Sequence, residues 1–294
     1  MGESAGVRAD VCHSSTDSSI CDTTSWLMYA GRPAVAILLF ICFSIFFTLQ
    51  AAAQNIPPRF HALVLAERGD QHEAYVAAAL AWLKTTAQKD NFTFDTFENP
   101  DKFTKPFLAH YQLFIQLNYP PYRWSDEAKA AFQDYIEQGR GGWVGFHHAT
   151  LLGEFDGYPM WPWFSDFMGG IRFKNYIAKR VSGTVVVEET AHPCLQGLPS
   201  TFVIGEEEWY TYDRDPRPNV HVLAHVDEAS YQPASDIKMG DHPVIWTNEK
   251  MKARNVYILM GHHPSLFAND NYKLLVHNAI FWAARVDGTY GVGK

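Results

Sequence analysis

From residue 59 onward, hydrophobic and polar positions follow two alternating patterns, one typical of buried strands and one typical of amphipathic helices. Short apolar or alternating runs predict strands at residues 60–67, 92–97, 111–118 and 143–147. Longer segments with apolar positions at helical spacing predict helices at residues 70–88 and 125–139. Asp70 and Ser125 are suited to cap these helices at their N-termini. The strand–helix–strand order predicts an α/β protein with a parallel sheet and helices on both faces.

The second half of the chain has a less regular pattern. An aromatic-rich stretch at residues 160–176 predicts a short helix and a loop, and residues 269–286 predict a closing amphipathic helix. Between them, strands are predicted at residues 183–189, 219–226, 242–249 and 253–261. The sequence shows no internal repeat and no long linker, so residues 54–294 are expected to form a single domain.

Residues 1–53 differ from the rest and have the layout of a secretory signal peptide behind a polar extension. Met28 opens a short basic start, an apolar run covers residues 34–49, and three alanines end at Ala53. We therefore expect Met28 to be the true start and cleavage to occur near Ala53, which makes the mature protein periplasmic or secreted. The alternative is an uncleaved N-terminal anchor, although the apolar run is slightly short for a span of about 20 residues.

Cleavage would change the composition of the chain. The formal net charge of −8 would become about −6, because residues 1–53 hold two basic and four acidic residues. Cys194 would be the lone cysteine, so no internal disulfide could form. An acidic chain without a basic run argues against nucleic-acid binding, and no stable membrane span would remain.

Two pairs of histidines stand where predicted buried strands end. His147 ends one strand and His148 follows it, whereas His262 and His263 follow another. Ligands of parallel sheets bind at the carboxyl ends of the strands, where His72 also lies, in the first strand–helix connection. We expect one shared pocket if the two strands are neighbours, with imidazole serving as acid, base or metal ligand. His147 and His262 are the main candidates, because adjacent residues of an extended chain point in opposite directions.

An acidic and aromatic stretch at residues 205–212 supplies a second candidate group. Three carboxylates, at positions 206–208, adjoin Trp209 and Tyr210. One inward carboxylate would serve as a base or metal ligand, and the rings would stack on the C–H face of a sugar. The alternative is a solvated acidic turn next to aromatic core residues.

Several common catalytic motifs are missing from the sequence. It has no G-x-S-x-G elbow, no P-loop and no H-E-x-x-H. The glycines at residues 139–142 precede their strand, whereas a dinucleotide fingerprint follows one. A serine nucleophile, a phosphate cradle and nicotinamide binding therefore have no support.

Four stretches resemble the trehalose-utilisation (ThuA-like) family: YIEQGRGGWVGFHHA, HPCLQGLPSTFVIGEEEWYTY, HPVIWT and ARNVYILMGHHPSLFANDNYKLLVHNAIFWAA. The resemblance covers about residues 59–286. It implies a flavodoxin-like three-layer fold, similar to class I glutamine amidotransferases. His147 stands where an amidotransferase would have its nucleophilic cysteine, so no glutaminase reaction is expected.

The resemblance also implies site residues. The family pattern marks histidines at the positions of His72, His147 and His262, and its acidic motif is matched at Glu207 and Glu208, with glutamate in place of aspartate in the first position. Tyr176 stands near the place where many members have a further histidine. We predict that the catalytic residues, and the ligands of any divalent ion such as zinc or manganese, are His147, Glu208 and His262. The predicted substrate-binding residues are His72, His148, Trp209, Tyr210 and His263.

The family resemblance implies carbohydrate catabolism, acting on an oxidised (3-keto) disaccharide or glycoside. A hydrolase or lyase would use His147 or Glu208 to remove a proton next to the keto group, and His262 or a divalent ion to stabilise the enolate. Two alternatives stay open: a non-catalytic carbohydrate-binding or accessory envelope protein, and a metal-dependent hydrolase of another envelope substrate. The expected partner is a small sugar, and the oligomeric state is open, a homo-oligomer included.

Overall fold

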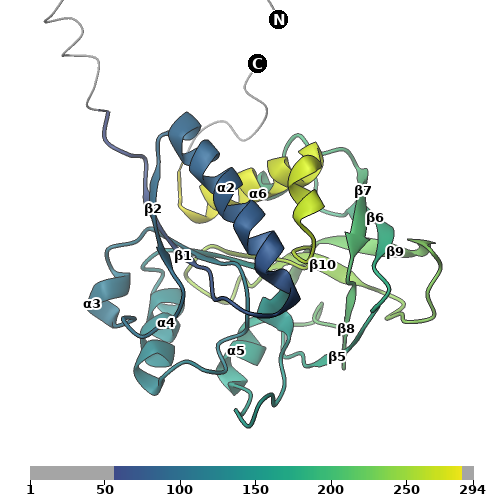
Figure 1. Ribbon diagram of the computed structural model, residues 1–294, viewed down its shortest axis with the longest axis horizontal. Coiled ribbons are helices and arrows are strands. Elements are labelled where there is room, and N and C mark those ends of the chain that lie inside the picture. The colour runs from purple at the N-terminus through teal and green to yellow at the C-terminus, as the bar shows by residue number, and fades with distance from the viewer. Residues whose placement is uncertain (1–55, 287–294) are drawn as a thin grey trace, which may run out of the picture. The chain divides into compact units, whose positions relative to one another are not determined.

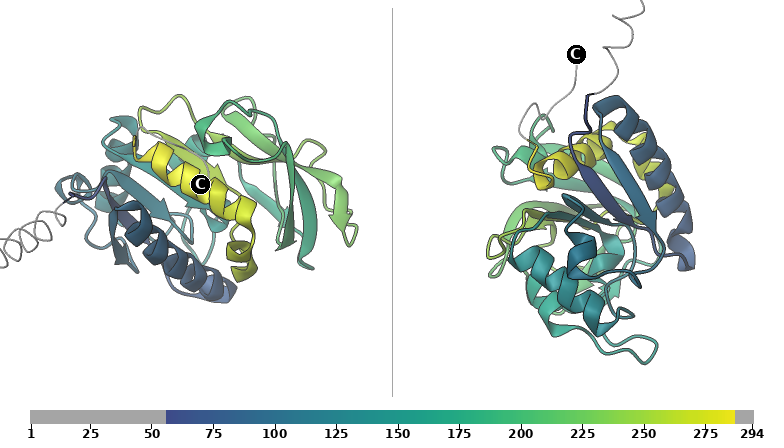
Figure 2. Two further views of the ribbon diagram at one scale, coloured as in Figure 1. Left: turned by 90° about the horizontal axis from the view of Figure 1, so that it is seen from above. Right: turned by 90° about the vertical axis from the view of Figure 1, so that its left-hand side faces the viewer.

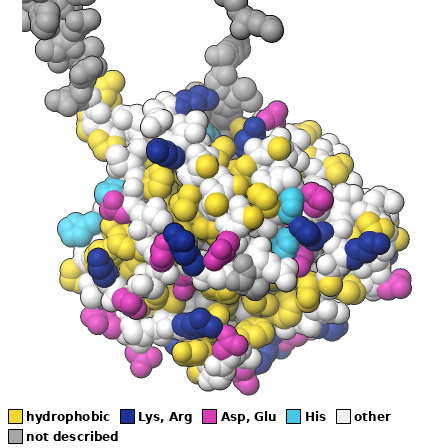
Figure 3. All heavy atoms as spheres, viewed as in Figure 1, with side chains coloured by type: hydrophobic (Ala, Val, Ile, Leu, Met, Phe, Trp, Pro, Cys, Tyr) yellow, Lys and Arg dark blue, Asp and Glu magenta, His cyan; other side chains and the backbone are white. Residues whose placement is uncertain are grey.

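The computed structural model describes residues 56–286, so the predicted signal peptide and its cleavage site lie outside the described residues. These residues form a nine-stranded sheet with helices packed on it, and a separate two-stranded sheet (Figure 1). Within residues 56–286, none of the helices is both long enough and apolar enough to cross a membrane. On the face shown in Figure 3, acidic and basic side chains are interspersed with hydrophobic ones.

Five parallel strands form one half of the large sheet, in the order β2-β1-β3-β4-β11. The strands are β1 (His61–Leu65), β2 (Thr93–Phe97), β3 (Leu113–Gln116), β4 (Gly142–Phe146) and β11 (Asn255–Ile258). All residues of β3, β4 and β11 are buried, because helices cover both faces of a parallel sheet. The predicted α/β sheet with parallel strands is confirmed in this half.

The other half of the large sheet is antiparallel and continues from β11 in the order β10-β9-β6-β7. The strands are β6 (Val181–Val187), β7 (Thr201–Glu207), β9 (His221–Gln232) and β10 (Pro243–Thr247). Along β6, buried and half-buried residues alternate, as expected of an antiparallel strand with one face on the core. The sheet is therefore mixed, with the predicted parallel strands joined by an antiparallel half.

Helices cover both faces of the sheet (Figure 2). One face carries α2 (Glu73–Asp90) and α6 (Asp270–Ala283), and the other carries α3 (Lys105–Leu108), α4 (Asp126–Glu137) and α5 (Pro162–Phe167). Ser125 caps α4 as predicted, since its hydroxyl accepts a hydrogen bond from the N–H of Ala128 (3.2 Å). The remaining elements are η1 (Asp70–His72), η2 (His147–Thr150), η3 (Pro193–Leu195), η4 (Pro264–Ala268), β5 (Phe173–Tyr176) and β8 (Tyr210–Tyr212).

The topology brings several strand ends to one place. β4 and β11 are direct neighbours, so the turns that follow them lie side by side at the carboxyl edge of the parallel strands. The connections after β1 and β3 leave the sheet at the same edge. The link between β7 and β8 reaches this edge too, because Glu207 bonds to the backbone of Gly261.

Candidate metal centre and active site

His147 starts the turn that follows β4. Its φ of +33° lies in the left-handed region, which a residue other than glycine rarely adopts, so the surrounding contacts must hold the turn. The Tyr257 hydroxyl donates to the carbonyl of His147 (2.9 Å). The ring Nδ1 donates to the carbonyl of Leu259 (3.0 Å), and Nε2 of the neutral ring therefore has no proton. This Nε2 is buried, and no described residue gives it a hydrogen bond.

Gly261 and Glu207 position His262 on the turn after β11. A Cβ on Gly261 would lie 2.8 Å from the Cβ of His147, so only glycine lets the two turns approach this closely. The fully buried Glu207 carboxyl group accepts hydrogen bonds from the N–H groups of Glu208 (2.9 Å), Gly261 (3.1 Å) and His262 (3.4 Å). Burial raises the pKa of Glu207 to about 8. Glu207 thus ties the β7–β8 link to the His262 turn.

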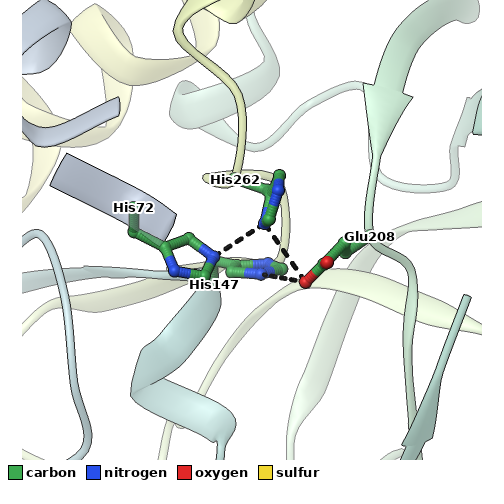
Figure 4. A group of neighbouring side chains, drawn as sticks. All are labelled: His72, His147, Glu208 and His262. Carbon is green, nitrogen blue, oxygen red and sulfur yellow. Dashed lines mark hydrogen bonds and ion pairs between the residues drawn. The ribbon is translucent and has the colours of Figure 1, made fainter. Parts of the chain in front are cut away.

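Four side chains meet where these turns converge: His72, His147, Glu208 and His262 (Figure 4). Nε2 of His72 lies 2.7 Å from Nδ1 of His262, which is 3.1 Å from Oε2 of Glu208. The same carboxylate oxygen is 3.7 Å from Nε2 of His147. One donor atom from each residue lies within 4.8 Å of all the others. The structure thus brings together the three predicted catalytic residues and adds His72 to them.

Burial sets the charges of this cluster. Together with the neighbouring imidazoles of His147 and His262, it lowers the pKa of His72 to about 2. Burial also lowers the pKa of His147. For Glu208, burial alone would raise the pKa, but the nearby imidazoles of His147 and His262 outweigh it and bring the pKa to about 2. At neutral pH the cluster therefore combines neutral imidazoles of His72 and His147 with an ionised carboxylate.

The cluster can hold a divalent metal ion. Neutral imidazole nitrogen and carboxylate oxygen bind zinc at about 2 Å, which places ligands of one ion roughly 3–4 Å apart. The donor atoms here are spread slightly wider, up to 4.8 Å, so they would close in on an ion. The partnerless Nε2 of His147 fits this role, since its Nδ1 already bonds to a backbone carbonyl, as is usual for metal-bound histidine. The 2.7 Å contact of two ring nitrogens likewise requires a shared proton or cation.

A cavity of about 210 Å³ lies next to the cluster and is bounded partly by it. Its polar residues come from the connections after β1, β4 and β7, and its aromatic residues come from β5 and β8. The lining residues are Gln71, His72, His148, Leu151, Phe173, Tyr176, Glu208 and Tyr210. No lysine or arginine belongs to this lining, so among described residues the cavity has no strong partner for a phosphate or carboxylate ligand.

Comparison with known proteins agrees with this picture. A family model described as ThuA, trehalose utilisation, matches residues 61–283. The chain belongs to the ThuA family. Membership associates it with trehalose utilisation. A comparison with curated proteins gave no match.

Solved structures support the fold of this ThuA-family chain. A ThuA-like protein from Bacteroides uniformis is 30% identical, with a TM-score of 0.70, and the match covers 79% of this chain and 94% of that one. A ThuA-like protein from Parabacteroides merdae is 19% identical, with a TM-score of 0.60 and coverage of 81% and 94%. A structure described as a GMP synthase protein from Thermoplasma acidophilum is 11% identical, with a TM-score of 0.50 and coverage of 76% and 94%. The last likeness concerns the fold alone and supports the predicted amidotransferase-like, flavodoxin-like architecture.

The second residue of each histidine pair behaves differently in this ThuA-family protein. His148 lies beside the cluster, with its ring centre 3.6 Å from that of His72. His263 instead lies at the start of η4, where its Nδ1 contacts the hydroxyl of Ser265 (2.7 Å) and lies 3.4 Å from Glu206. His148 reaches the cluster beside His147 because η2 starts at His147, so the alternation of an extended chain does not apply. His263 does not line the cavity.

The two aromatic residues predicted to contact substrate also lie in different places. Tyr210 lines the cavity, and its ring centre is 4.2 Å from that of His147. Trp209 is fully buried, and its Nε1 donates to the carbonyl of Val181 (3.1 Å). Adjacent residues alternate across the chain here, so Trp209 is a core residue, and its predicted contact with substrate is not supported.

Sequence reasoning missed Asn118, which follows β3 and is buried. Its Oδ1 lies 2.6 Å from Nδ1 of His148, and its Nδ2 donates to the carbonyl of Glu67 (2.9 Å). The sequence did contain a signal for Asn118, because it is a polar residue directly after a buried strand of the predicted parallel sheet. An amide, however, is not among the residue types that indicate acid/base or metal chemistry.

Proposed function

We propose that this ThuA-family protein cleaves an oxidised (3-keto) disaccharide or glycoside by acid/base chemistry. The observation that carries the proposal is the His72–His147–Glu208–His262 cluster at the wall of a cavity whose lining has no basic side chain of lysine or arginine. Aromatic rings of Phe173, Tyr176 and Tyr210 suit the C–H faces of sugar rings, and the polar wall suits their hydroxyl groups. The lack of lysine and arginine in the lining favours a neutral sugar over a phosphorylated one.

Glu208 is the proposed base. It is ionised at neutral pH and lines the cavity, and both of its ion pairs use Oε2, which leaves Oε1 for the substrate. A keto group acidifies the neighbouring C–H, so Oε1 can take that proton and generate an enolate. The enolate electrons then form a C=C bond as the glycosidic C–O bond breaks. The departing oxygen takes a proton from His262, whose Nδ1 lies 3.1 Å from Oε2 of Glu208.

The same four residues are proposed to hold a divalent ion, either zinc or manganese. When bound, such an ion would supply Lewis-acid polarisation of the substrate's keto oxygen. His147 would offer Nε2, since Leu259 occupies its Nδ1. Glu208 would offer Oε2 and keep Oε1 toward the cavity. We also propose that the protein is exported, on the basis of the signal-like pattern of residues 1–53.

The test uses purified chain from Gln54 onward and 3-keto-trehalose, with and without a chelator. We expect release of glucose, loss of at least about 100-fold in kcat for Glu208→Gln, and little change for the control Glu206→Gln, whose side chain is exposed. Metal analysis of the same sample should show one ion per chain. Binding of the sugar without product would instead favour the non-catalytic alternative, and equal rates for the two variants would exclude Glu208 as the base.

A further inference from the structure

The orientation of one buried amide determines where a proton sits in the site. Nδ2 of Asn118 donates to the carbonyl of Glu67 (2.9 Å), so its Oδ1 faces Nδ1 of His148 at 2.6 Å. An amide oxygen carries no hydrogen, and the His148 Nδ1 must therefore donate. In the neutral ring, Nε2 is then a bare acceptor.

The ring of His148 is held in place on several sides. Its centre lies 3.6 Å from that of His72 and 5.4 Å from the nearly parallel ring of Tyr119. Among the described side chains, which do not include that of Asp70, none forms a hydrogen bond with its Nε2, although His148 lines the cavity. His148 is also outside the group of four donor atoms that can share an ion. A fixed acceptor without a partner in the described part of the chain thus borders the space proposed for substrate.

We propose that His148 binds substrate by accepting a hydrogen bond at Nε2 from a sugar hydroxyl, and that Asn118 is the positioning residue that fixes this tautomer. The sugar identity of the ligand rests on the proposed function, whereas the tautomer does not. An acceptor atom attracts a hydroxyl and repels a keto oxygen. The substrate's keto oxygen therefore faces away from His148, and a hydroxyl faces His148.

This arrangement determines specificity. A sugar that keeps the hydroxyl opposite His148 binds, and an analogue with deoxy or O-methyl at that carbon leaves Nε2 buried without a donor. We expect such analogues to bind at least about tenfold more weakly. Oxidation at that same carbon is expected to be equally harmful, because it replaces the donor with an acceptor.

The tautomer is tested first, by long-range ¹H–¹⁵N spectra of the histidine rings in the chain from Gln54 onward. In the unmodified protein, the His148 signals should show the proton on Nδ1. In Asn118→Leu the protein loses the acceptor for this proton, so the signals should shift toward the Nε2–H form. A proton on Nε2 in the unmodified protein overturns the proposal, even if Asn118→Leu fails to fold.

The substrate contact is tested with His148→Phe and His148→Gln, using trehalose for calorimetric binding and 3-keto-trehalose for kinetics. The glutamine amide oxygen can replace the Nε2 acceptor, whereas phenylalanine cannot. We expect at least about a tenfold rise in the trehalose Kd and in KM for His148→Phe, substantial rescue by His148→Gln, and unchanged zinc stoichiometry in both. Turnover with no effect of His148→Phe overturns this inference alone. Trehalose binding that weakens in His148→Phe, without any turnover, supports the inference and overturns the cleavage reaction.

Discussion

The two histidine pairs have the same sequence pattern but different structures. After β4, the chain turns at once into η2, with His147 at φ +33°, and both rings of the pair reach the site. After β11, His262 reaches the cluster from a bend, and His263, whose backbone is extended, caps η4. The first pair thus supplies one residue to the His72–His147–Glu208–His262 cluster and one to the cavity lining, whereas the second supplies one cluster residue and one helix cap.

The difference teaches that backbone geometry decides which of two adjacent histidines is functional. An extended segment separates the directions of neighbouring side chains, and a tight turn with positive φ can bring them to the same side. Tyr257 helps to hold the first turn through the His147 carbonyl, and Glu207 holds the second through backbone N–H groups. The contrast can be tested at three levels.

The largest effect is expected when the pairs are compared as metal ligands. His262→Ala removes one of four donor atoms and should weaken zinc binding by at least about 100-fold, whereas His263→Ala should change it by less than about threefold. Competition with a chelator of known affinity measures both. Equal losses for the two variants would show that His263 enters the site, contrary to its position at η4.

Much of this arrangement was predictable from the sequence, and the parts that were not have physical causes. Buried strands followed by polar residues placed His147 and His262 at one edge of a sheet, because parallel strands end on the same side. That β4 and β11 are neighbours is a long-range pairing, which periodicity along the chain does not encode. In the antiparallel half, β6, β9 and β10 were predicted as strands and β7 was not. Strand direction depends on connections whose paths the local pattern does not specify.

The candidate site, like the fold, was only partly predictable from the sequence. The residue types of His147, Glu208 and His262 indicated their chemistry, and the structure brings them together. The roles of His148 and Asn118 depended on the φ of His147 and on the direction of an amide, and neither is visible in residue type. Trp209 and Tyr210 looked equivalent in sequence, yet one lies in the core and the other lines the cavity.

A second, smaller effect concerns acid stability of the metal-free protein. Burial lowers the pKa values of His72, His147 and His148, so below the unfolded value of about 6.5 the unfolded chain takes up protons that the folded one does not. The free energy of unfolding should therefore fall as pH decreases from 6.5 to 5. Each such histidine contributes about 1.4 kcal/mol per pH unit.

Between pH 6.5 and 5, Glu207 changes the free energy of unfolding in the opposite direction to the histidines. Its pKa is raised to about 8, so its contribution to stability is full below about pH 4.5 and is lost as the pH rises through 8. Outside the cluster, burial also lowers the pKa of His192 to about 4 and raises the pKa of Glu67 to about 8. With four histidines opposed by two carboxyls, we expect a net loss of about 2–3 kcal/mol per pH unit below 6.5. Urea unfolding at pH 6.5, 6 and 5 measures this slope. His148→Gln should lower it by about one third to one half, and the control His263→Gln should leave it unchanged.

The smallest effect is expected where the two turns touch. Gly261→Ala would place a Cβ 2.8 Å from the Cβ of His147, so one turn must shift, at a cost of about 1–2 kcal/mol in the free energy of unfolding. The matched control is Gly205→Ala in β7, where an added Cβ meets no atom within 4 Å and stability should change by less than about 0.5 kcal/mol. Zinc affinity should fall in Gly261→Ala alone, because the shift separates the His147 and His262 donor atoms. If stability drops but zinc binding is unchanged, the two turns are not rigidly coupled, and each histidine is positioned by its own contacts.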